Sequence, residues 1–288
     1  MVSIRTVRSR GAELRVQVSG AGAPVLLLHG WPHTRRLWDH VVPELAKHHT
    51  VLAPDLPGLG ESTAPYGGYG ADAIAADLGA ILDAARAEPA AVVAIDLAVP
   101  PAFVFALTAP ERVAALVLME SLLVPLPGAE EFLAEPPWWF GFHGVPGLAE
   151  AVLPGGEDAY LSYFLTEHTF ERRGIDPEIH ADFVRAYTGR EALARGFGYY
   201  RAAHGNAELI ARATASTRLT VPTLALGGNV VGPALGRQLA GVADDLEAHI
   251  VPECGHLIPL EQPAALLDLL VPFLSRSLRS VSVQRAQT

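Results

Sequence analysis

A single acidic residue marks the point where an unbroken apolar run meets a helix-forming segment. Residues 90–95 have the length and composition of a buried strand, and Asp96 follows them directly. Two small residues, Ala94 and Ala98, stand two places before and two places after it. A buried carboxylate is costly unless it has a partner or a chemical role. The segment therefore predicts a strand, a sharp turn that presents Asp96, and a helix.

Apolar runs of this kind alternate with helical patterns along most of the chain. The predicted strands are residues 24–28, 51–54, 91–95, 114–119, 223–226 and 248–251, and the predicted helices are residues 37–48, 71–85, 101–109, 234–243 and 263–274. Residues 3–7 and 13–18 predict an antiparallel hairpin at the edge of the sheet. Strand–helix alternation favours an α/β fold, with a mostly parallel, twisted sheet flanked by helices.

Residues 122–219 interrupt this alternation. They show no strand pattern, are rich in aromatic residues, and contain helical segments divided by proline and glycine turns. We expect an all-helical cap, or lid, inserted after the sixth strand. The α/β core would then comprise residues 1–121 and 220–276, and the polar residues 277–288 would form a flexible tail.

Charge and cysteine content exclude several classes of function. Lys+Arg is 21 and Asp+Glu is 31, a formal net charge of −10, which argues against nucleic acid or an anionic membrane as a partner. One cysteine, Cys254, allows neither an internal disulfide nor a cysteine metal cluster. The N-terminal residues lack the apolar stretch of a signal peptide, so we expect a cytoplasmic protein. Asp96 and two prolines near the middle of residues 87–107 disfavour a membrane span there.

Four motifs occur in a characteristic order. They are His29-Gly30-Trp31-Pro32, the loop Asp55-Leu56-Pro57-Gly58-Leu59-Gly60-Glu61-Ser62, the turn Ala94-Ile95-Asp96-Leu97-Ala98, and Cys254-Gly255-His256 followed by Glu261-Gln262-Pro263. Together they resemble the α/β-hydrolase fold over about residues 12–275, and within it the epoxide hydrolase and haloalkane/haloacetate dehalogenase branch. The turn is a nucleophile elbow with Asp in place of Ser, so the resemblance implies that Asp96 attacks saturated carbon and forms an alkyl-enzyme ester.

The resemblance also implies the partners of Asp96. His256 would activate water against the ester, and the backbone N–H groups of Trp31 and Leu97 would form an oxyanion hole. The usual position for the third member of the triad, after residues 223–226, carries no carboxylate. Some relatives place the acid about two dozen residues after the nucleophile, where Glu120 ends an apolar strand. We assign Glu120 as the acid that orients His256; the alternative is a solvated glutamate at a strand end.

Epoxide opening also needs a donor for the departing oxygen. Relatives use two cap side chains, which match Trp139 within residues 138–143 and Tyr200 within residues 199–201. Trp139 takes the place of a tyrosine; its indole N–H can donate but is a poorer acid, so Tyr200 is the better proton source. The alternative is that the tryptophans only pack the cap. The remaining predicted substrate contacts are Trp138, His29, Pro32, Phe142 and Tyr199.

The surroundings of the elbow indicate the class of substrate. Haloacetate dehalogenases carry arginines just after the nucleophile, where this chain has Leu97 and Pro100, so a small carboxylate is disfavoured. We expect a small-molecule substrate that is bulky, neutral and aromatic or polycyclic, such as a natural-product epoxide. No metal or organic cofactor is implied. We expect no nucleic-acid or membrane partner, and a monomer or homodimer.

Three functions fit the motifs. The leading hypothesis is an epoxide hydrolase that releases a vicinal diol. A hydrolytic dehalogenase would use the same aspartate. A catalytically degenerate hydrolase-fold binding protein is the third, because Ala98 and Val99 replace the glycines usual after the nucleophile. Ester or amide hydrolysis is disfavoured, since neither Ser nor Cys occupies the elbow.

Overall fold

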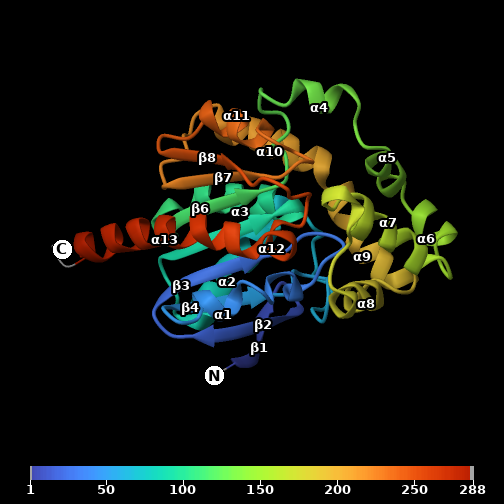
Figure 1. Ribbon diagram of the computed structural model, residues 1–288, viewed down its shortest axis with the longest axis horizontal. Coiled ribbons are helices and arrows are strands. Elements are labelled where there is room, and N and C mark those ends of the chain that lie inside the picture. The colour runs from blue at the N-terminus through green and yellow to red at the C-terminus, as the bar shows by residue number, and fades with distance from the viewer. Residues whose placement is uncertain (1, 286–288) are drawn as a thin grey trace.

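Eight strands form one sheet in the order β1-β2-β4-β3-β5-β6-β7-β8 in the computed structural model, which describes residues 2–285 and, of these, the side chains of 2–131 and 133–278 (Figure 1). The strands are β1 (Val2–Ser9), β2 (Ala12–Gly20), β3 (Ala23–Leu28), β4 (His49–Pro54), β5 (Ala90–Ile95), β6 (Val113–Met119), β7 (Thr223–Gly227) and β8 (Leu246–Ile250). β1 pairs with β2, and β2 with β4, in antiparallel fashion; all other pairs are parallel. The predicted α/β fold with a mostly parallel sheet and an edge hairpin is confirmed.

Helices cover both faces of the sheet. They include α2 (Ala71–Ala85), α3 (Val99–Thr108) and α11 (Ala234–Ala240) on one face, and α12 (Ile258–Glu261) and α13 (Pro263–Arg285) on the other. Alternate residues of a strand therefore join different cores: Val92 packs with α2 and α3, and Val93 with α13. Burial on both faces is the physical reason that β5 and β6 are continuous apolar runs.

The apolar stretch of residues 87–107 consists of a short connection (residues 87–89), β5, the 3₁₀ turn η2 (Asp96–Ala98) and most of α3. It is therefore part of the α/β core. Within residues 2–285, no helix combines the length and the apolar character that a membrane span requires.

Two predicted elements differ from the structure. Residues 37–48 do not form one helix: η1 (Arg35–Trp38) is followed by the short α1 (Val42–Leu45), because Pro43 lacks the N–H that a helix interior needs and instead lies in the first turn of α1. Residues 277–285, predicted to be a flexible tail, continue α13, and Leu278 is buried against the core. Residues 286–288 lie outside the described part of the chain.

The segment between β6 and β7 contains only helices among its regular elements. They are α4 (Glu130–Ala134), α5 (Trp138–Gly144), α6 (Leu148–Val152), α7 (Glu157–Glu167), η4 (Phe170–Arg172), α8 (Pro177–Ala186), α9 (Arg190–Arg201) and α10 (Ala203–Thr214); η3 (Pro110–Arg112) precedes β6. We call α4 to α10 the helical insertion. In Figure 1 α5 to α9 lie to the right of the sheet. The division into two domains, with boundaries at residues 122 and 219, stays a prediction.

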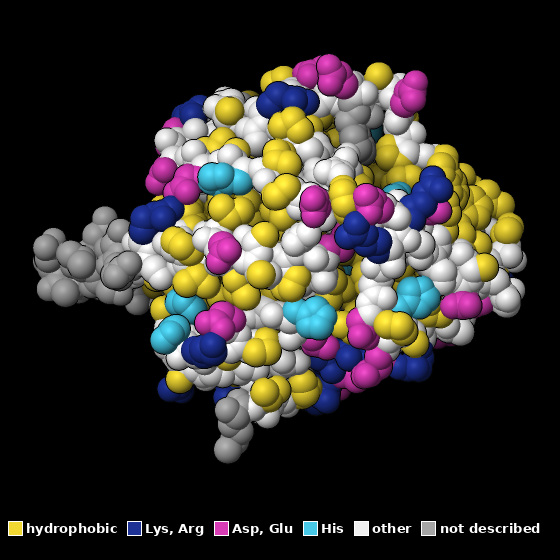
Figure 2. All heavy atoms as spheres, viewed as in Figure 1, with side chains coloured by type: hydrophobic (Ala, Val, Ile, Leu, Met, Phe, Trp, Pro, Cys, Tyr) yellow, Lys and Arg dark blue, Asp and Glu magenta, His cyan; other side chains and the backbone are white. Residues whose placement is uncertain are grey.

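The outer surface of the insertion is unusually apolar. Exposed hydrophobic side chains on α5, α6 and α7 include Trp138, Leu148, Val152 and Tyr163. Figure 2 shows hydrophobic side chains gathered at the right of the view, over these helices, whereas charged side chains are scattered over the core. The aromatic side chains of the insertion therefore lie partly in its interior and partly on its surface.

Candidate active site

Asp96 stands on the sharp turn between β5 and α3. Ile95 still has extended dihedral angles, and Asp96 has φ of 57°, in the left-handed region that residues other than glycine seldom occupy. Gly30 makes room for it: a Cβ atom at Gly30 would lie 2.1 Å from Asp96 Oδ1. The strained turn and the close glycine together project the carboxylate away from the strand, and its side chain is 17% exposed.

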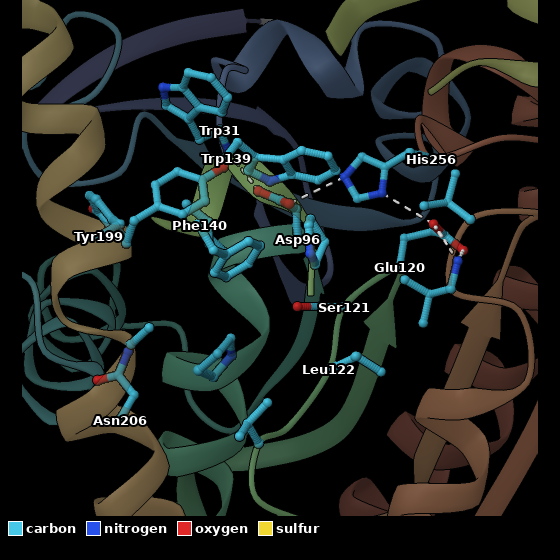
Figure 3. Close-up of a pocket in the computed structure, with 18 of the residues that line it drawn as sticks. Trp31, Asp96, Glu120, Ser121, Leu122, Trp139, Phe140, Tyr199, Asn206 and His256 are labelled. Carbon is cyan, nitrogen blue, oxygen red and sulfur yellow. Dashed lines mark hydrogen bonds and ion pairs between the residues drawn. The ribbon is translucent and has the colours of Figure 1, made fainter. Parts of the chain in front are cut away.

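Two groups hold the Asp96 carboxylate (Figure 3). The backbone N–H of Trp31 donates to Oδ1 at 2.8 Å, and His256 Nε2 lies 3.2 Å from Oδ2. Burial raises the pKa of Asp96, but the hydrogen bond and charge of His256, with help from the Trp31 N–H, outweigh it and leave the pKa below its usual value. Asp96 is therefore an ionised carboxylate near neutral pH. Leu97 follows it directly on the cavity wall.

Glu120 lies behind His256. Its Oε2 is 3.1 Å from His256 Nδ1, and its Oε1 accepts the N–H groups of Gly228 at 2.5 Å and Val231 at 3.2 Å. Glu120 is 1% exposed, so it is not a solvated strand-end residue. The glycine-rich loop after β7 carries no carboxylate of its own. Its backbone N–H groups instead donate hydrogen bonds to the carboxylate of Glu120.

His256 is clamped between two carboxylates. Burial lowers the pKa of His256, but the hydrogen bonds and charges of Asp96 and Glu120 outweigh this effect and raise the pKa to about 10. The resting site at neutral pH therefore contains an imidazolium between two carboxylates. Such a histidine cannot act as a base until one of its anionic neighbours is neutralised.

A cavity of about 400 Å³ separates the core from the helical insertion. Nine of the predicted site residues line it: Trp31, Pro32, Asp96, Leu97, Glu120, Trp139, Tyr199, Tyr200 and His256. Asp96, Glu120 and His256 come from the core and Trp139 and Tyr199 from the insertion, and Figure 3 shows Tyr199 on the opposite side from His256 and Glu120. The structure thus brings together segments far apart in the sequence.

Three predicted substrate contacts do not reach the cavity. Trp138 is 54% exposed, because successive residues of a helix point about 100° apart and Trp139 takes the inward position. Phe142 packs beside Trp138 within the insertion. His29 is fully buried, with Nδ1 2.8 Å from the carbonyl of Gly30 and Nε2 accepting a backbone N–H, and it fastens loops below the site.

The two tyrosines at the end of α9 differ in what their hydroxyl groups contact. Tyr199 donates to the carbonyl of Pro57 at 2.8 Å, which fixes the insertion to a core loop. Among the described residues, none hydrogen-bonds the Tyr200 hydroxyl. The ring of Tyr200 packs at 5.6 Å from Trp31 and 5.1 Å from Phe140, and burial raises its pKa well above the usual value. Tyr200 is thus a neutral donor in the cavity wall.

Three cavity histidines were absent from the predicted set, and two of them, His33 and His168, lie beside His256. The ring centres of His33 and His168 lie 6.2 and 6.3 Å from that of His256. Burial lowers the pKa of His33 to about 3 and that of His168 to about 4, so both are neutral at pH 7. His33 directly follows the Gly30-Trp31-Pro32 motif, which could have indicated it. His168 lies in the insertion, where no motif pointed to it.

Comparison with known proteins agrees with this geometry. The model of the alpha/beta hydrolase fold family matches residues 23–263. A soluble epoxide hydrolase of Corynebacterium sp. (strain C12) is 28% identical over 91% of this chain and 94% of its own. A 2-hydroxy-6-oxo-2,4-heptadienoate hydrolase of Pseudomonas putida is also 28% identical, over 94% and 96% of the two chains.

Solved structures give the same result. The Cif epoxide hydrolase of Acinetobacter nosocomialis superimposes with a TM-score of 0.86 at 26% identity, over 95% of this chain and 89% of that one. The family match covers most of the chain, and the relatives named above are hydrolases. The chain therefore belongs to the alpha/beta hydrolase fold family and is an epoxide hydrolase-like enzyme.

Proposed function

We propose that this enzyme opens a neutral epoxide to a vicinal diol through an ester on Asp96. The observation that carries the proposal is the ionised carboxylate at the elbow, facing the cavity and held by the Trp31 N–H and His256. A carboxylate that attacks saturated carbon forms an alkyl ester, whose carbonyl carbon water can then attack. Serine hydrolases of this fold carry a hydroxyl at that position instead.

In the first step an Asp96 oxygen bonds to an epoxide carbon, and the carbon–oxygen bond of the ring breaks. The departing oxygen takes the proton of the Tyr200 hydroxyl, assisted by the indole N–H of Trp139. An alkoxide is a stronger base than a phenolate, so a tyrosine with a raised pKa remains a competent donor. The proton on His256 then restores Tyr200, which leaves His256 neutral.

In the second step His256 takes a proton from water. Esterification of Asp96 removes one of the two negative charges that raise the pKa of His256, so the imidazole becomes a base only when the ester is present. Water oxygen bonds to the carbonyl carbon, and the N–H groups of Trp31 and Leu97 hold the oxyanion. Collapse releases the diol, whose oxygen takes the proton from His256, and the proton left on the Asp96 carboxyl passes to His256 and restores the resting imidazolium. Glu120 keeps the imidazole oriented throughout.

The cavity supports a bulky neutral substrate. A volume of about 400 Å³ falls within the range of drug-sized ligand sites. Among the described residues that line it there is no Lys or Arg, and the His256 imidazolium is already paired with two carboxylates, so a substrate carboxylate would find no free counter-charge. Phe140, Phe164 and Ile210 give the walls an apolar and aromatic character. We therefore propose an aromatic or polycyclic epoxide, of the kind found among natural products, and a cytoplasmic monomer or homodimer.

A hydrolytic dehalogenase is the second candidate, because the indole N–H of Trp139 at the cavity wall could bind a departing halide. A His256→Gln variant separates the two. Loss of the base should stall the second step and trap the ester on Asp96. We would incubate it with styrene oxide and with 1-chlorohexane and measure the intact mass. A gain of the whole epoxide mass supports the proposal, whereas a gain of the chloroalkane minus hydrogen chloride indicates a dehalogenase. Turnover of styrene oxide by Asp96→Asn at the wild-type rate would exclude the ester mechanism.

A further inference from the structure

The loop that carries His256 is attached directly to the helical insertion. The backbone N–H of His256 donates to the carbonyl of His168 at 2.7 Å. Gly255 lies so close to the same segment that a Cβ atom would stand 2.2 Å from the His168 carbonyl and 2.7 Å from Thr169 Cα. The base and residues 168–170 therefore hold one another in place.

One carboxylate joins the two segments a second time. Glu261 Oε2 accepts the N–H of Phe170, in the insertion, at 2.7 Å and that of Gly255 at 2.9 Å. Glu261 Oε1 accepts the N–H of Leu257 at 2.8 Å. The side chain thus binds the residues on both sides of His256 together with the insertion. Hydrogen bonds from N–H groups to an ionised carboxylate are about twice as strong as neutral ones.

We propose that Glu261 is a positioning residue for His256, which it holds at the distance from Asp96 and Glu120 that ester hydrolysis requires. Glu261 itself does not line the cavity and acts through the loop. The same contacts place His168 beside His256 and 5.0 Å from the ring of Trp139, so the base and the insertion wall of the cavity are set together. The kinetic readout rests on the proposed epoxide hydrolysis, whereas the positioning itself does not.

Replacement of Glu261 by Gln tests this directly. The amide has one oxygen where the carboxylate has two, so at least one of three N–H groups would face an NH₂ group instead of an acceptor. His256 would move relative to its carboxylates. Because His256 acts as the base only in the second step, ester hydrolysis should slow more than ester formation. A residue that merely stabilised the fold would change both steps in parallel.

The matched control is Glu253→Gln, the same change at an exposed position of the same loop. Glu261→Asp keeps the charge but is one methylene shorter, and it serves as the second variant should Glu261→Gln fail to fold. For each folded variant, rapid quenching after mixing with styrene oxide and intact-mass measurement give the rates at which the ester forms and disappears.

We expect Glu261→Gln to slow ester hydrolysis by about 10- to 100-fold, the usual cost of removing a residue that orients a reacting group. Ester formation should change by less than about threefold, the ester should accumulate, and Glu253→Gln should match wild type. Equal slowing of both steps, or no accumulation, would overturn the proposal.

A second measurement needs no substrate. Titration of the His256 ring by ¹⁵N NMR, assigned with His256→Gln, should give a lower pKa in Glu261→Gln than in wild type. The groups facing His256, namely Asp96, Glu120, His33 and His168, are unchanged, and Glu261→Asp, which keeps the negative charge, should also lower the pKa, so that displacement is separated from loss of the Glu261 charge. An unchanged pKa overturns the positioning role. If wild type is inactive on styrene oxide, only the proposed function is in question, because this titration still decides the role of Glu261.

Discussion

The two walls of the cavity are built on different principles. On the core side, Asp96, His256 and Glu120 form a chain of hydrogen bonds, and backbone N–H groups complete each end of it. On the insertion side, Tyr200 and Trp139 are held mainly by aromatic packing. The core side therefore fixes charges and distances, whereas the insertion side fixes shape.

This difference indicates that the core side controls the rate of the reaction and that the insertion side controls which substrates are accepted. Preorganised charges act on the transition state, and small displacements of them are costly. Aromatic walls tolerate repacking at smaller cost, so they can be retuned to new substrates while the reaction is kept. We expect core-side changes to lower the rate by about 10³-fold or more and insertion-side changes to lower it by about 100-fold or less.

Removal of the proposed nucleophile should have the largest effect. Asp96→Asn keeps the shape but loses the negative charge, and we expect diol formation to fall by about 10⁴-fold or more. Rates of diol release from styrene oxide would be measured by chromatography. The control is Asp245→Asn, the same change at an exposed site. A fall of less than tenfold in Asp96→Asn would mean that the core side does not hold the nucleophile.

Glu120→Gln should come next. The amide would present N–H to His256 Nδ1 or leave Gly228 without its acceptor, so the imidazole would lose its orientation. We expect a loss on the order of 10³- to 10⁴-fold in kcat, as in triads whose acid is changed to an amide. The exposed Glu191→Gln, in the insertion, should have no effect. Equal activity of the two variants would contradict the role of Glu120.

The core side also predicts how stability varies with pH. The folded pKa of His256, about 10, lies above its unfolded value, so its contribution is fully present below pH 6.5 and is lost as the pH rises toward 10. We expect a loss on the order of 2–4 kcal/mol between pH 6.5 and 10.5, measured by urea unfolding. The His256→Gln variant should lose less over that range. If both proteins lose the same amount, the imidazolium is not bound between the carboxylates.

On the insertion side, Tyr200→Phe should have a smaller effect than the changes at Asp96 and Glu120. Loss of the hydroxyl should slow ester formation about 100-fold, since a general acid contributes at least that much. Tyr199→Phe is the matched control, because it removes a hydroxyl that bonds Pro57 rather than facing substrate. It should cost about 1 kcal/mol of stability and little rate. Rapid-quench kinetics with styrene oxide would separate them, and the reverse order of effects would refute the assignment.

The smallest effect is expected at the tryptophan pair. Trp139→Phe should lower kcat/KM for styrene oxide by less than about tenfold and change the preference among epoxides of different size, because it removes one donor and alters the wall. Trp138→Phe, on the exposed face of the same helix, should leave both unchanged. Steady-state kinetics on a size series of aryl epoxides makes the comparison. A larger effect at Trp138 would show that the cavity face of α5 is misassigned.

The sequence predicted the core wall better than the insertion wall, for a physical reason. Asp96 follows a buried strand on a tight turn with small residues on both sides, and His256 follows a glycine in its loop. These sequence patterns locate both residues. Glu120 could be proposed because a carboxylate ending a buried strand needs a partner. The structure brings all three together.

The insertion wall has no such local signature. Which of Trp138 and Trp139 points inward depends on how α5 packs, and adjacent tryptophans look equivalent in the sequence. His168 reaches the site only because residues 168–170 dock on the His256 loop, a contact between distant segments. The proline itself could have predicted that the helix expected over residues 37–48 is broken at Pro43. The continuation of α13 beyond residue 276, in contrast, depends on the burial of Leu278 against the core.

In the proposed mechanism the oxygen atom that enters the diol comes from Asp96. A single turnover with styrene oxide in H₂¹⁸O, with enzyme in excess, tests it most directly. We expect an unlabelled diol and one ¹⁸O atom in the peptide that contains Asp96, because water attacks the carbonyl carbon of the ester. A diol labelled in that single turnover, with Asp96 unlabelled, would show direct attack of water on the epoxide and would contradict the ester mechanism.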